Sequence, residues 1–258
     1  MKSMWTKPPD LKGVLFDKDG TLVDFSRTWT GIIKRSARLA SAGNETLERE
    51  LLVACGTDPV TGTTAPDSLF ASGNTREIAE RMRQLGSPFT VADLVRQMDE
   101  LFVSGSSDAV AITDLADVFE KIKSLGLLIG IASSDNEASI RITLEALGIA
   151  GTVDFVAGYD SGHGVKPEPG MVRAFCAHAG CTPSQVLLVG DNRHDLEMGR
   201  AAGCGGNIGV LSGTGTAATL ETLADVLLSD VGKLPDLLFD NGRSRSVPNG
   251  EIHDKTGH

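Results

Sequence analysis

The sequence of 258 residues lacks long apolar runs and an excess of positive charge. No run approaches the ~18 consecutive apolar residues of a membrane-spanning helix. Residues 1–10 contain no apolar segment of the signal-peptide type. These absences predict a cytoplasmic protein with no membrane partner. The net charge of -10 argues against nucleic acid as the main partner, because binding a polyanion requires a basic face.

Cysteine is also scarce, with four residues at positions 55, 176, 181 and 204 and no CxxC pair. No histidine stands at zinc-finger spacing, which argues against a structural zinc site, and the thiols are expected to be reduced. Hydrophobic residues make up 41% of the chain and charged residues 22%, a balance that supports a buried core. The length exceeds one average domain of about 100–200 residues, so the remainder should have a role of its own.

The expected secondary structure changes character along the chain. A short buried strand is expected at residues 13–16, and four amphipathic helices follow it, interrupted by a Thr-, Gly-, Ser- and Pro-rich loop at 57–75. From about residue 108, helices capped by Thr113 and Asn136 alternate with strands. The further strands are expected at residues 127–132, 155–157, 186–189 and 208–211. Alternation of this kind predicts a parallel sheet with helices on both faces.

The predicted fold class is therefore α/β, a Rossmann-like doubly wound parallel sheet core with an inserted α-helical cap domain. Residues 1–24 and 108–240 form the core domain, and residues 25–107 form the cap. The first strand precedes the insertion and its sheet partners follow it, so the cap is expected to lie over the strand ends. Residues 241–258 are polar with no apolar period and are predicted to be a disordered tail.

Chemically useful side chains follow the predicted strands, where ligands gather in a parallel sheet. Asp17 and Asp19 follow the first strand, Ser133 follows the second, and Lys166 lies in the loop after the third. Asp191 follows the fourth strand, and a further carboxylate, at position 195, comes one turn later. Carboxylates meeting at one edge repel each other unless a cation neutralises them, and hard oxygen ligands favour Mg²⁺. A lysine and a hydroxyl beside such a metal predict a phosphate site.

Four motifs in order resemble those of the haloacid dehalogenase superfamily. They are Asp17-Lys18-Asp19-Gly20-Thr21, Ser133 after a strand, Lys166-Pro167-Glu168-Pro169, and Gly190-Asp191-Asn192-Arg193-His194-Asp195. The helical insertion after the first motif resembles the helical C1 cap of the subgroup that includes phosphoglycolate phosphatases and β-phosphoglucomutases. The resemblance covers roughly residues 11–230.

The resemblance implies a role for each motif residue. Asp17 would attack phosphorus and form a phosphoaspartyl enzyme, and Asp19 would act as the general acid and base. Ser133 would donate a hydrogen bond to a phosphoryl oxygen, and Lys166 would neutralise another.

The same resemblance implies a set of metal ligands. Asp17 and Asp191 would bind Mg²⁺ through their side chains, and Asp19 through its backbone carbonyl. Asp195 would either bind the metal through water or hold Lys166, and the sequence leaves both alternatives open.

Five further residues are candidates for substrate binding. Gly20 gives the loop the permissive backbone needed to fold over a phosphate, Thr21 ends the first motif, and Ser134 follows Ser133. Trp29, near the start of the first cap helix, either contacts substrate or packs the helix core. Arg76 lies in a segment that resembles a cap loop carrying a cleft arginine, and it either grips a carboxylate or second phosphate or lies on the helix surface.

Three other features receive mostly structural interpretations. Lys18 departs from the apolar residue usual at this place in the family. It either adds positive charge near the site, or it is directed to solvent or supports the site residues from outside. His194 is expected at a solvated helix start. Ser212-Gly213-Thr214-Gly215 lacks a P-loop lysine and is interpreted as a turn.

The function that these features predict is a Mg²⁺-dependent phosphatase of small organic phosphomonoesters, with phosphoglycolate as the family-level substrate. The expected partner is a small phosphorylated metabolite, and the expected state is a monomer or homodimer. A phosphosugar mutase that uses the same residues is one alternative. A non-catalytic phosphate-binding module is another, although the intact set of aspartates and Lys166 weighs against it.

Overall fold

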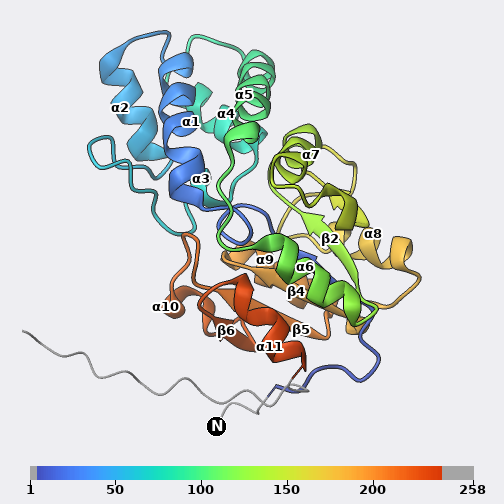
Figure 1. The fold of residues 1–258 in the computed structure, drawn as a ribbon. Helices are drawn as coiled ribbons and strands as arrows, with labels where there is room; N and C mark the ends of the chain where they lie inside the picture. Colours follow the sequence, from blue (N-terminus) through green and yellow to red (C-terminus); the bar gives the residue numbers. More distant parts are fainter. Residues whose placement is uncertain (1–4, 240–258) are drawn as a thin grey trace, which may run out of the picture.

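The structure, a computed structural model, describes residues 5–239, and their core is one sheet of parallel strands (Figure 1). The strand order is β3-β2-β1-β4-β5-β6, which confirms the predicted doubly wound α/β class. The strands are β1 (Gly13–Phe16), β2 (Leu128–Ala132), β3 (Phe155–Ala157), β4 (Val186–Gly190), β5 (Gly206–Val210) and β6 (Val226–Leu228). Sequence patterns missed β6, which has only three residues. The predicted tail at 241–258 lies outside the described residues.

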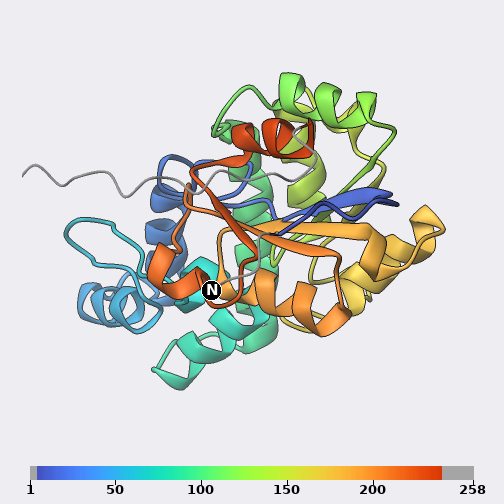
Figure 2. The same cartoon turned by 90° about the horizontal axis from the view of Figure 1, so that it is seen from below.

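Helices cover both faces of the sheet (Figure 2). Val14 and Phe16 of β1 point to one face, where they pack in a cluster with residues of the helices α6 and α7 and the chain segment at α11. Leu15 points to the opposite face and packs with residues of α8 and α9. This alternation follows from the two-residue period of a strand, and it explains why β1 is buried on both sides. These helices are α6 (Leu115–Ser124), α7 (Glu137–Ala146), α8 (Gly170–Ala179), α9 (Arg193–Ala202) and α11 (Leu234–Phe239).

The inserted segment forms a helical unit with its own hydrophobic cluster, in which Trp29, Ile33 and Met98 are buried. Its helices are α1 (Phe25–Ala40), α2 (Glu45–Ala54), α3 (Leu69–Ser72), α4 (Thr75–Gln84) and α5 (Val91–Gly105). The four expected helices are confirmed. The single-turn helix α3 was missed because it lies inside a segment whose composition is typical of a loop.

Several predicted boundaries were wrong by one or two residues. Asp114, rather than Thr113, caps α6, and its side chain accepts a hydrogen bond from the Asp117 amide at 3.1 Å. The sequence pattern predicts a helix over residues 168–179, but α8 begins at Gly170, because Pro169 occupies the cap position. The short helix α10 (Ala217–Leu220) and α11 were also missed.

The chain order around β1 determines where a ligand can bind. Strand β1 pairs with β2 on one side and with β4 on the other, so the connections run in opposite directions from it. Such a reversal leaves a crevice outside the carboxyl ends of the two strands. Asp17 and Asp191 follow β1 and β4 there, and the cap helices stand beyond the same edge (Figure 1).

Two further predictions can be compared with the described residues. All four cysteines are free thiols. None of the helices between residues 5 and 239 combines the length and apolar character needed to cross a bilayer.

Candidate active site

Lys166 connects two buried carboxylates at the crevice. Its Nζ lies 2.5 Å from Oδ1 of Asp17 and 2.6 Å from Oδ1 of Asp195. Burial would lower the pKa of Lys166, but the two carboxylates outweigh it and raise the pKa. The lysine is therefore held charged. Of the two alternatives left open for Asp195, the contact with Lys166 is present in this structure.

Asp191 is supported by two loops. Oδ1 accepts a hydrogen bond from Thr21 Oγ1 at 3.3 Å, and Oδ2 accepts one from the Thr214 amide at 2.9 Å. A Cβ on Gly20 would lie 2.5 Å from Asp191 Oδ2, and one on Gly213 would also clash with this carboxylate. Glycine at both positions lets the two backbones approach. The segment 212–215 was interpreted as a simple turn, and it holds this carboxylate in place.

Three carboxylates form a cluster suited to a cation. One oxygen each of Asp17, Asp191 and Asp195 lies within 4.8 Å of the others, and all three residues are buried. Lys166 supplies one positive charge against three negative ones when all are ionised. Burial and the neighbouring carboxylates raise the pKa of Asp17 to about 7 and that of Asp191 well above its usual value. A divalent cation would remove this excess charge, so the donor set fits Mg²⁺.

This cluster predicts a pH dependence of stability without metal. The pKa of Asp17 is 3.8 in an ordinary setting and about 7 here, so between these values the folded protein binds the proton more tightly than the unfolded chain. The contribution of Asp17 to the free energy of unfolding therefore falls as pH rises through this window. We expect Mg²⁺ to raise the melting temperature more at pH 8 than at pH 5, measured by thermal unfolding against EDTA. An equal gain at both values, or a gain retained in Asp191→Asn, would contradict the site.

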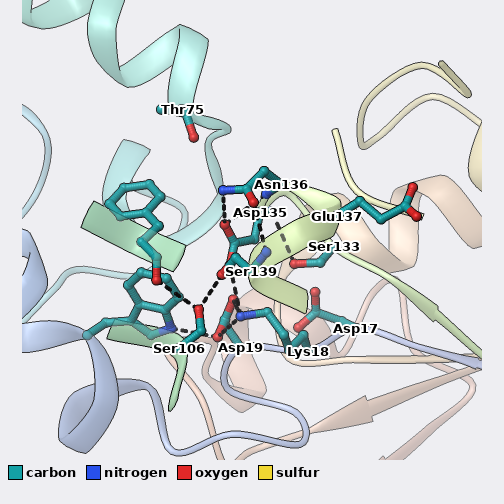
Figure 3. Close-up of polar contacts among 12 residues, drawn as sticks. Asp17, Lys18, Asp19, Thr75, Ser106, Ser133, Asp135, Asn136, Glu137 and Ser139 are labelled. Atoms are coloured by element: carbon teal, nitrogen blue, oxygen red, sulfur yellow. Dashed lines mark hydrogen bonds and ion pairs between the residues drawn. The ribbon is translucent and has the colours of Figure 1, made fainter. Parts of the chain in front are cut away.

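The carboxylate of Asp19 is held by two neighbouring side chains, those of Lys18 and Trp29. It lies 2.8 Å from Lys18 Nζ and accepts a hydrogen bond from Trp29 Nε1 at 2.5 Å. Lys18 also pairs with Asp135 at 3.0 Å (Figure 3). Its Nζ lies 4.9 Å from the centre of the Trp29 ring.

Lys18 is only 1% exposed, so it does not face solvent. It supports the site through its ion pairs with Asp19 and Asp135. Burial acts to lower the pKa of Lys18, but Asp19 and Asp135 raise it overall. Asp135 accepts hydrogen bonds from Ser139 Oγ and, at 2.8 Å, from the Asn136 amide. Sequence patterns missed Asp135, because nothing in them showed that Lys18 would be buried and need a second partner.

The cleft brings most of the candidate residues together. Asp17, Asp19, Ser133, Ser134 and Trp29 line it, as do Lys166, Asp191 and Asp195. Trp29 packs edge to face against Phe102 with ring centres 5.2 Å apart, as the packing alternative expects, and it also donates a hydrogen bond to Asp19. Contact of Trp29 with substrate stays a prediction.

Two candidates for substrate binding, Thr21 and Arg76, are not among the residues that line the cleft. Thr21 is fully buried and directs its hydroxyl to Asp191. Arg76 is exposed and is not among the residues that line the cleft, which matches the surface alternative for this side chain.

His194 and Asn192 extend the list of cleft residues. His194 was expected to be solvated, but it is half-buried, and its Nδ1 is a buried atom without a hydrogen-bond partner among the described residues. The same is true of Asn192 Oδ1. The motif spacing pointed to Asp191 and Asp195 as site residues. It did not indicate that Asn192 and His194, which lie between them, would line the cleft.

Comparison with known proteins agrees with this geometry. Residues 11–203 match the family of haloacid dehalogenase-like hydrolases. The chain belongs to this family. As a haloacid dehalogenase-like hydrolase, it is similar to the phosphoglycolate phosphatase of Escherichia coli (strain K12), with 29% identity over 211 residues, 76% of this chain and 79% of the relative. The phosphoglycolate phosphatase of Salmonella typhi is 27% identical, over 77% of this chain and 81% of the relative.

Solved structures share the fold of this haloacid dehalogenase-like hydrolase. A predicted phosphoglycolate phosphatase from Haemophilus somnus aligns with a TM-score of 0.68 and 19% identity, covering 89% of this chain and 98% of that one. A putative β-phosphoglucomutase from Thermotoga maritima aligns with a TM-score of 0.62 and 20% identity, covering 89% and 99%. At these identities the likeness concerns the fold alone.

Proposed function

We propose that this hydrolase is a phosphatase that cleaves small organic phosphomonoesters and depends on Mg²⁺. The observation that carries the proposal is the contact of Lys166 with Asp17, at 2.5 Å, in a crevice that also contains Asp19 and Asp191. A phosphate group needs positive charge on its oxygens and a nucleophile in line with the bond to be broken. Lys166 and a cation at the carboxylates would supply the charge, and Asp17 would supply the nucleophile.

The proposed reaction has two steps. A carboxylate oxygen of Asp17 forms a bond to phosphorus, the bond from phosphorus to the ester oxygen breaks, and Asp19 gives its proton to the departing alcohol. Asp19 then removes a proton from water, which attacks the phosphoaspartate and releases inorganic phosphate with the Asp17 carboxylate restored. Ser133 and Lys166 hold the phosphoryl oxygens through both steps. Mg²⁺ bound at Asp17 and Asp191 would neutralise the charge that gathers on phosphorus.

We prefer hydrolysis to a mutase reaction, in which a phosphoryl group would move from one position of a sugar to another. The relatives at 27–29% identity are named phosphoglycolate phosphatases, whereas the putative mutase shares the fold at 20% identity. Phosphoglycolate is the substrate that the relatives' names suggest, and it is the reference compound for any assay.

The direct test is release of inorganic phosphate from p-nitrophenyl phosphate and phosphoglycolate after EDTA treatment, with and without added Mg²⁺. We expect release only after Mg²⁺ is restored. A hexose 1-phosphate incubated in parallel should give free phosphate, and its conversion to the hexose 6-phosphate would favour the mutase.

The environment of Asp19 yields a prediction for Lys18. In Lys18→Met, Asp19 loses its ion pair, and a misplaced general acid should lower kcat/KM for alkyl phosphates by roughly 100-fold. The value for p-nitrophenyl phosphate should fall only a few-fold, because p-nitrophenolate leaves without a proton. Lys18→Arg keeps the charge and should restore part of the alkyl phosphate activity. An equal loss for both substrate types would indicate general damage to the fold.

A further inference from the structure

The part of the cleft that the cap supplies, here termed the cap wall, is apolar. It is formed by Phe25, Trp29, Ile33, Phe70, Ile78 and Phe102. Each of these side chains is at most 8% exposed. Apolar atoms of a ligand that fill such a space leave water, which favours binding, whereas polar atoms there lose water and gain no hydrogen bond.

Two polar side chains at the start of α4, beside the cap wall, already have partners. Thr75 Oγ1 donates a hydrogen bond to Asp99 Oδ1 at 2.8 Å. At the start of α4, the Glu77 amide donates to Asn74 Oδ1 at 3.1 Å, and the Asn74 amide donates to Glu77 Oε2 at 2.9 Å. The two carboxylates in these contacts, Asp99 and Glu77, are not among the residues that line the cleft. This side of the cleft therefore offers an anionic ligand group no counter-ion among its described lining residues.

Positive charge at the cleft lies at its phosphate end. Among the described residues that line the cleft, Lys166 is the one lysine or arginine, and it already contacts two carboxylates. Lys18, behind Trp29, is likewise paired with Asp19 and Asp135. His194 also belongs to this end, since it stands next to Asp195 at the start of α9. A carboxylate placed against the cap wall would be desolvated without a counter-ion, which is costly.

We propose that the preferred substrates carry an uncharged, apolar alkyl or aryl group on the phosphate, and that a carboxylate or second phosphate on this group is selected against. The inference rests on the proposed phosphatase function and deepens it. Phosphoglycolate, whose leaving group carries a carboxylate, falls in the disfavoured class.

The test compares substrates that differ by one carboxylate. Ethyl phosphate is paired with phosphoglycolate, and phenyl phosphate with 4-phosphonooxybenzoate. We expect kcat/KM to be roughly 100-fold higher for the uncharged member of each pair, because the carboxylate finds no partner at the cap wall. Along a series of n-alkyl phosphates, kcat/KM should rise roughly fourfold per methylene until the cleft is filled.

The outcomes separate the two proposals. Equal or faster turnover of the carboxylated compounds would overturn the apolar preference and leave the phosphatase function standing. No turnover of any compound with Mg²⁺ present would overturn both.

A matched pair of variants tests the cause of the preference. Ala71 lines the cleft and is half-buried, so it accepts a longer side chain more readily than the cap wall residues. Ala71→Lys adds a cation, and Ala71→Met adds similar length without charge. The ratio of kcat/KM for phosphoglycolate over ethyl phosphate should be at least roughly tenfold higher in Ala71→Lys than in Ala71→Met. Equal ratios in the two folded variants would show that missing positive charge does not set the preference.

Discussion

Replacement of Asp17 by Asn is expected to lower phosphate release from p-nitrophenyl phosphate by roughly 10⁴-fold or more, because the amide cannot form the bond to phosphorus. The variant should fold, since Asn keeps the size of the side chain. It should also reduce the number of buried carboxylates around Lys166 from two to one.

Asp108→Asn is the matched control for this variant. It makes the same chemical change at an exposed carboxylate in the turn after α5, away from the cleft. Its kcat should equal that of the unmodified protein. If Asp17→Asn kept most of its turnover under the same conditions, Asp17 would not be the nucleophile.

Lys166→Met should have the largest effect on stability. The change leaves Asp17 and Asp195 buried without their shared cation, and loss of one partner from a buried ion pair typically costs about 3–5 kcal/mol. We expect the free energy of unfolding in EDTA, measured by denaturant titration, to fall by about this amount. Mg²⁺ should restore part of it by neutralising the same carboxylates. Activity should be lost in either condition, because a phosphoryl oxygen loses its charged partner.

A double variant distinguishes charge from packing as the cause. Lys166→Met combined with Asp195→Asn removes one of the two unpaired carboxylates, so it should be more stable than Lys166→Met alone. If the double variant lost at least as much stability as the single one, lost packing would be the better explanation.

The sequence was most informative where one physical rule determines the outcome. Buried strands such as residues 13–16 could be identified from their apolar runs, and Asn136 was correctly identified as the cap of α7. Because parallel strands end at one edge, the convergence of Asp17, Lys166 and Asp191 could also be predicted without coordinates. The structure brings these three residues to one cleft.

Tertiary packing decided the features that sequence patterns missed. Whether Lys18 would face solvent depended on Asp135, which lies more than 100 positions away in the chain and pairs with it at 3.0 Å. The segment 212–215 has ordinary turn composition, and only its approach to Asp191 reveals its role. Arg76 was a candidate because of a resemblance in its loop, but the local helix turns its side chain to solvent. Neither the contacts of Lys18 and of segment 212–215 nor the exposure of Arg76 has a short-range signal in the sequence.

Trapping the proposed phosphoaspartate shows directly whether Asp17 is the nucleophile. The enzyme with Mg²⁺ is mixed with excess p-nitrophenyl phosphate, quenched in acid within the first turnovers, and digested for mass spectrometry. We expect one phosphoryl group on the peptide that contains Asp17, absent from Asp17→Asn and from enzyme treated with EDTA. A phosphoryl group on another residue during turnover, or an unmodified Asp17 peptide under conditions that trap a known aspartyl phosphatase, would contradict it.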